Sequence, residues 1–268
     1  MKIDIGSILE QRIGNKLQKP VVYLLERLIH QNTMNGFLSK NSDKRGISLF
    51  KELLKELNIS GKWVNENKLP SDGRCIFVSN HPLGAIDGVV ISCMLYDKYG
   101  DIRYLVNDML YNIEPLKEIF LPVNTTRGFQ NKEVAKNIKE VMQGDIPIAS
   151  FPAGYCSRFI DGKVQDRVWK KNFINQAIRN ERDIIPLFFD ARNSIHFYLI
   201  EYLRKKLKIK LDFGTVLLPD EMFRARNKSF DITVGDRISY QSIIDMNMNN
   251  IEASKYVRDC CYNLKNKK

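Results

Sequence analysis

No stretch of the 268-residue sequence contains the roughly 20 consecutive apolar residues that a membrane-spanning helix requires. The longest candidates are interrupted by charges, one at Glu26 and Arg27 and the other at Glu201 and Arg204. Residues 1–19 also lack the apolar core of about 7–15 residues that defines a secretory signal. We therefore expect a protein that is not exported by that route and that meets a membrane only at its surface.

Cysteine and histidine are scarce. The five cysteines form no C-x-x-C pair and are odd in number, which favours reduced thiols in an intracellular protein. The three histidines are scattered, so we expect no metal site. The sequence has no recognised nucleic-acid motif, and its aromatic residues do not interleave with its basic clusters, so we expect no nucleic acid partner.

Positive charge, by contrast, is in excess. With 42 Lys and Arg against 31 Asp and Glu, the formal charge is +11, in a chain of ordinary globular composition. Such an excess suits nucleic acid, an anionic lipid surface, or acidic substrates and partners such as phosphates and carrier proteins. The modest clusters at Arg204–Lys210, Arg224–Lys228 and Lys265–Lys268 are equally explained as a solvated basic face. Net charge alone therefore does not identify the partner.

The N-terminal third is helical in pattern. Apolar residues recur every three or four positions from Ile8 to Phe37, which predicts two amphipathic helices, and a third is predicted over Ser48–Leu57. These apolar faces can rest on anionic lipid or pack in the core. A turn-rich segment, Asn65–Gly73, marks the boundary of this region.

Beyond the boundary, short apolar runs mostly alternate with helical stretches. The alternation predicts an α/β fold, with a mostly parallel mixed sheet flanked by helices and an N-terminal amphipathic helical segment. We assign residues 1–65 to an N-terminal helical region that can contact a membrane surface, 66–245 to the α/β domain, and 246–268 to a C-terminal helix and basic tail. The predicted strands are Cys75–Ser79, Ile102–Val106, Ile119–Val123, Ile146–Phe151, Ile184–Phe189, Lys210–Leu218 and Ser229–Val234, and the later helices are Val89–Tyr99, Asn131–Met142, Val168–Arg179, Ile195–Leu207 and Ile251–Leu264.

The most informative stretch is Phe77–Gly88, where an apolar strand ends in Asn80-His81 and a Pro/Gly loop leads to Asp87-Gly88. A carboxylate near a strand-end histidine can hold the imidazole in one tautomer and stabilise its protonated form, which makes a general base. The alternative is that His81 bonds a backbone group and Asp87 caps the following helix.

Two further loops follow apolar strands. Phe151-Pro-Ala-Gly-Tyr-Cys-Ser-Arg158 contains a glycine that lets backbone amides approach an oxyanion or phosphate, with Arg158 beyond it. In Leu121–Gly128, Arg127 can grip a phosphate or carboxylate. Either arginine is as well explained by a surface ion pair. Functional residues of such sheets tend to collect in loops beyond the strand ends.

Taken in order, these residues resemble the four blocks of the glycerolipid acyltransferase superfamily of lysophosphatidic acid type: Asn80-His81 with Asp87, Arg127, Phe151-Pro-Ala-Gly154 with Ser157-Arg158, and the Ile185-Pro-Leu187 strand. The run Asn-His-Pro-Leu-Gly-x-x-Asp-Gly, together with Phe-Pro-Ala-Gly, resembles more narrowly the bacterial hemolysin-like O-acyltransferases of amino-acid lipid synthesis. The resemblance spans Phe77–Phe189, less than half of the chain.

The sequence departs from the family pattern twice. Five residues separate His81 from Asp87, where the family usually has four, and the Pro/Gly loop can absorb the extra one. Ala153 replaces a family glutamate thought to help hold a glycerol-phosphate acceptor. A methyl group accepts no hydrogen bond, which favours an acceptor such as the hydroxyl of an N-(3-hydroxyacyl) amino acid.

The resemblance implies direct acyl transfer from a thioester of acyl carrier protein or coenzyme A to a mono-acylated lipid, with no cofactor and no metal. His81 would be the general base and Asp87 its orienting carboxylate at the mouth of a fatty-chain pocket, with amides near Gly154 stabilising the oxyanion. It also implies a protein at the cytoplasmic face of the cell membrane, with a lyso-lipid and an anionic membrane surface as partners. The residues it assigns to substrate binding are Asn80, Gly84, Gly88, Arg127, Phe151, Pro152, Gly154, Ser157 and Arg158.

Three other functions remain open at this point. One is a lysophospholipid (1-acylglycerol-3-phosphate) acyltransferase. Another is a hydrolase with Ser157 or Cys156 as nucleophile, although no G-x-S-x-G elbow is present. The third is a basic peripheral membrane-binding module without catalysis.

Overall fold

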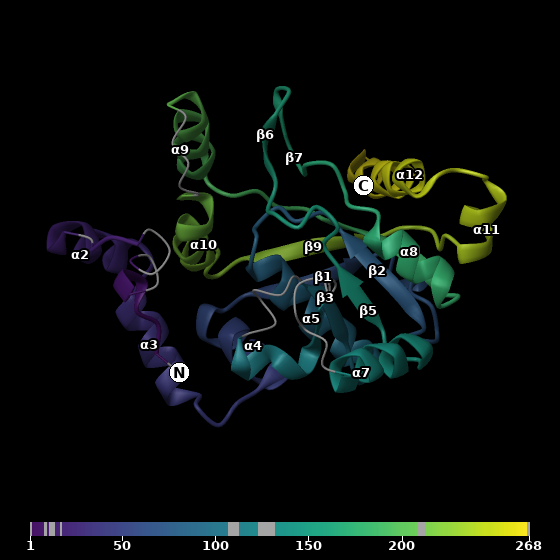
Figure 1. Cartoon of the computed structure of the whole chain (residues 1–268), viewed down its shortest axis with the longest axis horizontal. Coiled ribbons are helices and arrows are strands. Elements are labelled where there is room, and N and C mark those ends of the chain that lie inside the picture. The colour runs from purple at the N-terminus through teal and green to yellow at the C-terminus, as the bar shows by residue number, and fades with distance from the viewer. Residues whose placement is uncertain are drawn as a thin grey trace.

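The computed structural model describes residues 2–7, 10, 14–16, 18–106, 113–122, 132–207 and 213–266. A twisted sheet of seven strands lies at its centre within these residues (Figure 1). The strands are ordered β1 (Ser60–Val64), β9 (Ser229–Val234), β8 (Asp183–Phe189), β2 (Cys75–Ser79), β5 (Ile148–Ser150), β3 (Arg103–Val106) and β4 (Phe120–Pro122).

Neighbouring strands of this sheet are parallel except β8 and β9, which pair antiparallel. The register places Phe77 of β2 beside Ala149 of β5 on one side and Ile185 of β8 on the other. The carboxyl ends of β2, β5 and β8 therefore meet at one edge of the sheet. In parallel sheets this edge is where ligands bind.

Helices cover both faces of the sheet because each strand alternates its side chains between them. In β8, Ile185, Leu187 and Phe189 join the core beneath α4 (Gly46–Leu57) and α5 (Ile86–Tyr99). Ile184 and Phe188 of the same strand join the opposite core. The helices packed on that second face are α7 (Lys132–Gln143), α8 (Asn172–Arg179), α11 (Tyr240–Asp245) and α12 (Asn250–Asn263).

Further elements extend from the sheet and the helices that cover its two faces. Two helix pairs, α2 (Lys19–Leu28) with α3 (Gln31–Lys40) and α9 (Ile195–Lys206) with α10 (Phe213–Arg224), lie together at the left of Figure 1. An antiparallel hairpin of β6 (Arg158–Ile160) and β7 (Lys163–Gln165) rises beside α9. Three short 3₁₀ helices complete the described elements: η1 (Glu66–Lys68), η2 (Glu114–Ile119) and η3 (Leu264–Asn266).

Arg182 ties α7 to the sheet from a fully buried position. Its guanidinium donates hydrogen bonds to the carbonyls of Val141, Met142, Gly144 and Ile146. These carbonyls lie at and just beyond the end of α7, where a helix leaves its last carbonyls without partners. One side chain thus satisfies the end of this helix.

The α/β class and the mostly parallel sheet are confirmed, and six predicted strands overlap β2, β3, β4, β5, β8 and β9. Val123 and Asn131, at the ends of two predicted elements, fall outside the described residues. The strand predicted over Lys210–Leu218 is wrong, because its described part, residues 213–218, belongs to helix α10. A short apolar run does not distinguish a strand from a helix, and here α10 packs against α9. No helix of the described chain has the length and apolarity to cross a bilayer.

Candidate active site

His81 and Asp87 face each other across the loop that joins β2 to α5. His81 lies two residues beyond the end of β2, and Asp87 stands in the first turn of α5. The loop turns between them at Gly84, whose φ of +82° is a conformation that residues with a Cβ rarely adopt. The His81 Nδ1 and Asp87 Oδ2 atoms are 3.0 Å apart. The extra residue in this loop therefore does not separate the two side chains.

Asp87 is fully buried, and both of its carboxylate oxygens accept hydrogen bonds. Its Oδ2 atom also accepts hydrogen bonds from the amides of Leu83 at 2.9 Å and Gly84 at 3.3 Å, and its Oδ1 accepts from Gly88 at 2.9 Å. Amide donors stabilise the ionised carboxylate, and an ionised carboxylate only accepts. The hydrogen between Asp87 and His81 therefore sits on Nδ1, which leaves the Nε2 lone pair of the imidazole able to take a proton.

The environment of His81 favours its protonated form. Burial of the ring lowers its pKa, but the charge and hydrogen bond of Asp87, helped by the charge of Asp166, outweigh burial and raise the pKa above the ordinary value of 6.5. The Phe151 ring stacks on the imidazole with a centroid distance of 4.1 Å and an interplanar angle of 19°. Only 14% of the His81 side chain is exposed. One face of the imidazole is thus closed by Phe151.

Asp166 organises the loops around His81, and no sequence motif marks this residue. This buried carboxylate follows β7 and accepts hydrogen bonds from the His81 amide at 3.2 Å and the Ser157 hydroxyl at 2.6 Å through Oδ1. Its Oδ2 accepts from the Trp169 indole at 2.9 Å. The Ser157 amide in turn donates to the His81 carbonyl at 2.7 Å. Asp166 therefore joins the histidine loop to the loop after β5.

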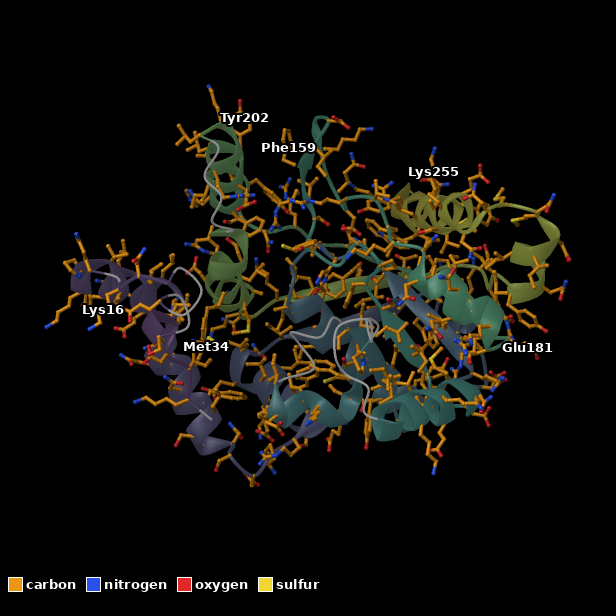
Figure 2. The ribbon with its side chains drawn as sticks, in the orientation of Figure 1. Lys16, Met34, Phe159, Glu181, Tyr202 and Lys255 are labelled. Atoms are coloured by element: carbon orange, nitrogen blue, oxygen red, sulfur yellow. The ribbon has the colours of Figure 1, made fainter. Side chains whose placement is uncertain are left out.

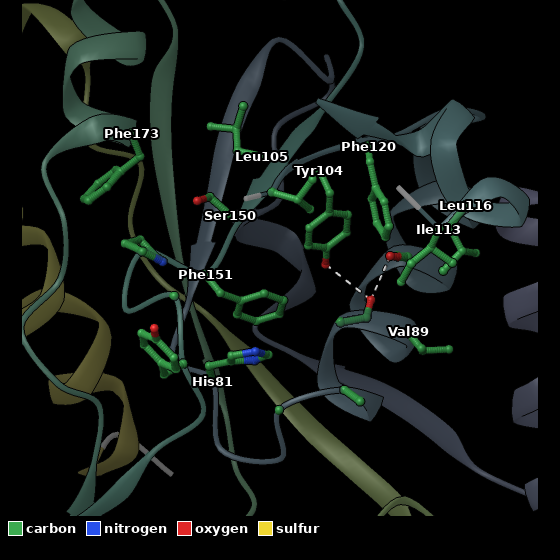
Figure 3. A pocket seen from close by; sticks show the side chains of 18 of the residues that line it. His81, Val89, Tyr104, Leu105, Ile113, Leu116, Phe120, Ser150, Phe151 and Phe173 are labelled. Carbon is green, nitrogen blue, oxygen red and sulfur yellow. Dashed lines mark hydrogen bonds between the residues drawn. The ribbon is translucent and has the colours of Figure 1, made fainter. Parts of the chain in front are cut away.

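An apolar cavity of about 380 Å³ opens beside His81. Figure 3 shows His81 and Phe151 between Phe173 on one side and a group of apolar side chains on the other. Ser92 and Tyr104 also line it, but both hydroxyls donate to the Gly88 carbonyl, at 2.7 and 3.3 Å, so their polar ends are satisfied. The apolar group comprises Val89, Leu105, Val106, Ile113, Leu116 and Phe120. Such a wall suits a hydrocarbon chain.

The structure brings six of the predicted site residues to this cavity, namely His81, Gly84, Gly88, Phe151, Pro152 and Gly154. Gly88 is constrained by packing, because a Cβ at this position would lie 3.3 Å from the Phe151 ring. The Gly154 amide donates to the Phe151 carbonyl at 3.0 Å. This amide is therefore engaged in a turn rather than directed at an oxyanion.

Asn80, Ser157 and Arg158 do not line the cavity. Asn80 joins the ends of β2 and β8, because its side chain accepts from the Phe189 amide at 2.7 Å and donates to the Phe189 carbonyl at 3.0 Å. Arg158 is buried, with its Nε 3.2 Å from Glu201 Oε2 on α9. Their contacts hold elements of the fold together around the site. Arg127 lies outside the described residues.

In the described residues, the geometry does not favour a serine nucleophile or a metal site. The Ser157 hydroxyl donates to the Asp166 carboxylate rather than to an imidazole. His30 is engaged elsewhere, with its Nε2 2.9 Å from Asp220 Oδ1 on α10. Among the residues that the structure describes, no group of three or more His, Cys, Asp or Glu side chains is arranged to hold a metal ion.

Comparison with known proteins identifies the family to which the chain belongs. Two relatives are each 36% identical over 266 residues, or 98% of this chain: the lyso-glycine lipid O-acyltransferases of Phocaeicola vulgatus and Bacteroides thetaiotaomicron, of which the match covers 95% and 97%. The crystal structure of PlsC, the 1-acyl-sn-glycerophosphate acyltransferase of Thermotoga maritima, superposes with a TM-score of 0.50 at 15% identity, covering 91% of this chain and 94% of that one. This likeness shows the shared fold. The model of the family described as Acyltransferase matches residues 12–268, and the chain therefore belongs to this family of acyltransferase enzymes.

Proposed function

We propose that this acyltransferase moves a fatty acyl group from a thioester to the hydroxyl of a lyso-glycine lipid or a similar N-(3-hydroxyacyl) amino acid. The observation that carries the proposal is the His81–Asp87 pair at the wall of an apolar cavity. The names of the two relatives support the acceptor, since the match extends over nearly the whole of each chain. Ala153 supports it too, because its buried side chain is packed in the core and offers no carboxylate to a glycerol-phosphate.

The chemistry is direct transfer without an enzyme-bound intermediate. The acceptor hydroxyl oxygen attacks the thioester carbonyl carbon while the hydroxyl proton passes to His81 Nε2. The carbon–sulfur bond then breaks, and the departing thiolate takes up the proton, which gives an ester and a free thiol. Asp87 holds Nδ1–H and balances the positive charge of the imidazolium. General-base assistance of this kind is worth about 10²–10⁴-fold in rate.

The donor in this proposal is a thioester of acyl carrier protein or coenzyme A. Both are strongly anionic, and the net charge of +11 attracts such partners. The apolar cavity beside His81 has room for the hydrocarbon chain of an acyl group. No further cofactor takes part in the step.

The same proposal places the enzyme on the cytoplasmic face of an anionic membrane, where its lipid acceptor resides. Helix α9 supports this placement because much of its apolar surface is exposed, including Ile195, Leu199 and Tyr202. Tyr202 lies at the same edge of the molecule as the exposed Phe159 of β6, at the top of Figure 2. Helix α2 likewise buries none of its residues. Exposed apolar and aromatic groups beside lysines are typical of surfaces that lie on lipid.

Transfer by the purified enzyme tests the proposal. With acyl carrier protein thioester or acyl-coenzyme A and lyso-glycine lipid in mixed micelles, we expect release of free thiol and an equal amount of diacylated product by mass spectrometry. His81→Ala should abolish both, while its binding to anionic vesicles stays close to that of the unsubstituted enzyme. Preferential acylation of lysophosphatidate would overturn the acceptor, and undiminished transfer by His81→Ala would overturn the mechanism.

A further inference from the structure

The cavity has a polar end as well as an apolar one. Lys170 and Asn172 line it immediately before Phe173, which Figure 3 places on the side of His81 opposite Leu116 and Phe120. Because the hydroxyls of Ser92 and Tyr104 are already bonded, the apolar end has little polarity to offer a substrate. We therefore expect a polar headgroup in this cavity to lie at the Phe173 end, where Lys170 and Asn172 can contact it.

Lys170 is positioned at that end by the loop after β5. Its amide donates to the Pro152 carbonyl at 3.0 Å, and Pro152 follows the Phe151 ring that stacks on His81. Its ammonium passes close over Gly154, where a Cβ would lie 3.4 Å from Nζ, which is van der Waals contact. The cation thus lies beside the loop that carries Phe151, at the exposed rim of the wall that His81 also lines.

The described lining of the cavity carries charge of one sign. Of the described residues that line it, Lys170 carries the one permanent cation, and none carries a carboxylate. Lys170 is itself exposed, so it stands at the open end of the cavity, where an ionised headgroup first begins to lose its water and gains from a partner of opposite charge. A lysine ammonium supplies both the charge and the hydrogen bonds that a carboxylate requires.

We propose that the Lys170 ammonium binds the carboxylate of the acceptor lipid and so selects an amino-acid lipid over an uncharged one. This inference rests on the proposed function, because that function supplies an acceptor whose carboxylate is only a few covalent bonds from the reacting hydroxyl. In either donor, the nearest phosphate is separated from the thioester by the whole pantetheine arm. A cation on the same wall as His81 therefore matches the acceptor rather than the donor.

The test compares lyso-glycine lipid with its primary amide, which has nearly the same shape and no charge. For the unsubstituted enzyme we expect the amide to have a KM about two- to fivefold higher, as for the loss of an ion pair with an exposed lysine. Lys170→Met should raise the KM for the acid by the same factor, leave the amide unchanged, and so abolish the preference. Lys170→Arg should keep the preference. Lys171→Met changes the neighbouring lysine, which is also exposed but does not line the cavity, and should behave as the unsubstituted enzyme.

The outcomes separate the two proposals. If the unsubstituted enzyme acylates neither acceptor, the proposed function is overturned, and this inference with it. If it acylates the acid and Lys170→Met keeps the full preference for the acid over the amide, only the Lys170 assignment is overturned. A rise in the KM of the thioester donor with an unchanged acceptor KM would assign Lys170 to the donor, which also overturns it.

Discussion

The substitution Asp87→Asn tests the central pair most directly, because it keeps the size of the side chain and removes its charge. The amide oxygen can replace Oδ2 as acceptor for His81, Leu83 and Gly84, but its NH₂ group then meets the Gly88 amide, which now donates to Oδ1. The opposite orientation turns the NH₂ group toward three donors. At least one buried hydrogen bond is lost in either case, which costs about 1–3 kcal/mol of stability.

The larger effect falls on catalysis. Without the carboxylate, the imidazolium that forms in the transition state has no balancing charge, and we expect kcat to fall about 10²–10⁴-fold. Activity needs neutral His81, so it should rise with pH through the pKa of His81, which lies above 6.5 in the unsubstituted enzyme because Asp87 outweighs burial. Removing the charge of Asp87 lowers that pKa, and the acid limb of the profile should move to lower pH.

The assay is the initial rate of thiol release against pH at saturating donor and acceptor. Asp97→Asn is a matched control on the same helix, since its carboxylate forms an exposed ion pair with Lys51 at 2.6 Å, away from the cavity. The control should keep both the rate and the profile. An Asp87→Asn enzyme that retains the rate and the acid limb of the unsubstituted protein would refute the assignment of Asp87 as the partner of the base.

Three further changes probe the surroundings of the pair. Asp166→Asn should lower kcat and, because the charge of Asp166 also raises the pKa of His81, move the acid limb to lower pH; an unchanged pH profile would restrict Asp166 to a purely structural role. Gly84→Ala should lower the free energy of unfolding by about 1–3 kcal/mol, because φ is +82° and the new Cβ would meet Leu218 Cδ2 at 2.6 Å; thermal denaturation measures this, and an unaltered melting temperature would contradict it. Arg182→Met should lower the free energy of unfolding by about 2–4 kcal/mol, because it leaves buried carbonyls at the end of α7 without a donor. Denaturant titration measures this loss, and an unchanged midpoint would contradict it.

The sequence predicted the elements that are defined by local pattern. The strands β2 and β8 carry uninterrupted apolar runs because helices cover both of their sides, and such runs are visible without any structure. By contrast, β1, whose side chains are only partly buried, was missed, and so were the short strands of the β6–β7 hairpin. The assignment of α10 as a strand failed because only its packing against α9 decides between the two.

The candidate site divides in the same way. His81 and Asp87 are six positions apart, so a local motif contains both halves of the pair. The contacts of Asp166 with His81 and of Lys170 with Pro152 join segments far apart in sequence, and nothing local marks either residue. Arg158 was predicted to bind substrate because it follows a loop beyond a strand, but its guanidinium pairs with Glu201 on the distant helix α9.

In the proposed reaction, the ring of Phe151 affects how readily the thioester donor is hydrolysed. Because it shields one side of the imidazole and little of His81 is open, a water molecule must reach Nε2 by the path that the lipid hydroxyl uses. Hydrolysis and esterification then compete for the same path to Nε2, and a bound acceptor lipid keeps water out of that path. Futile loss of activated fatty acid should consequently be confined to periods when acceptor is scarce.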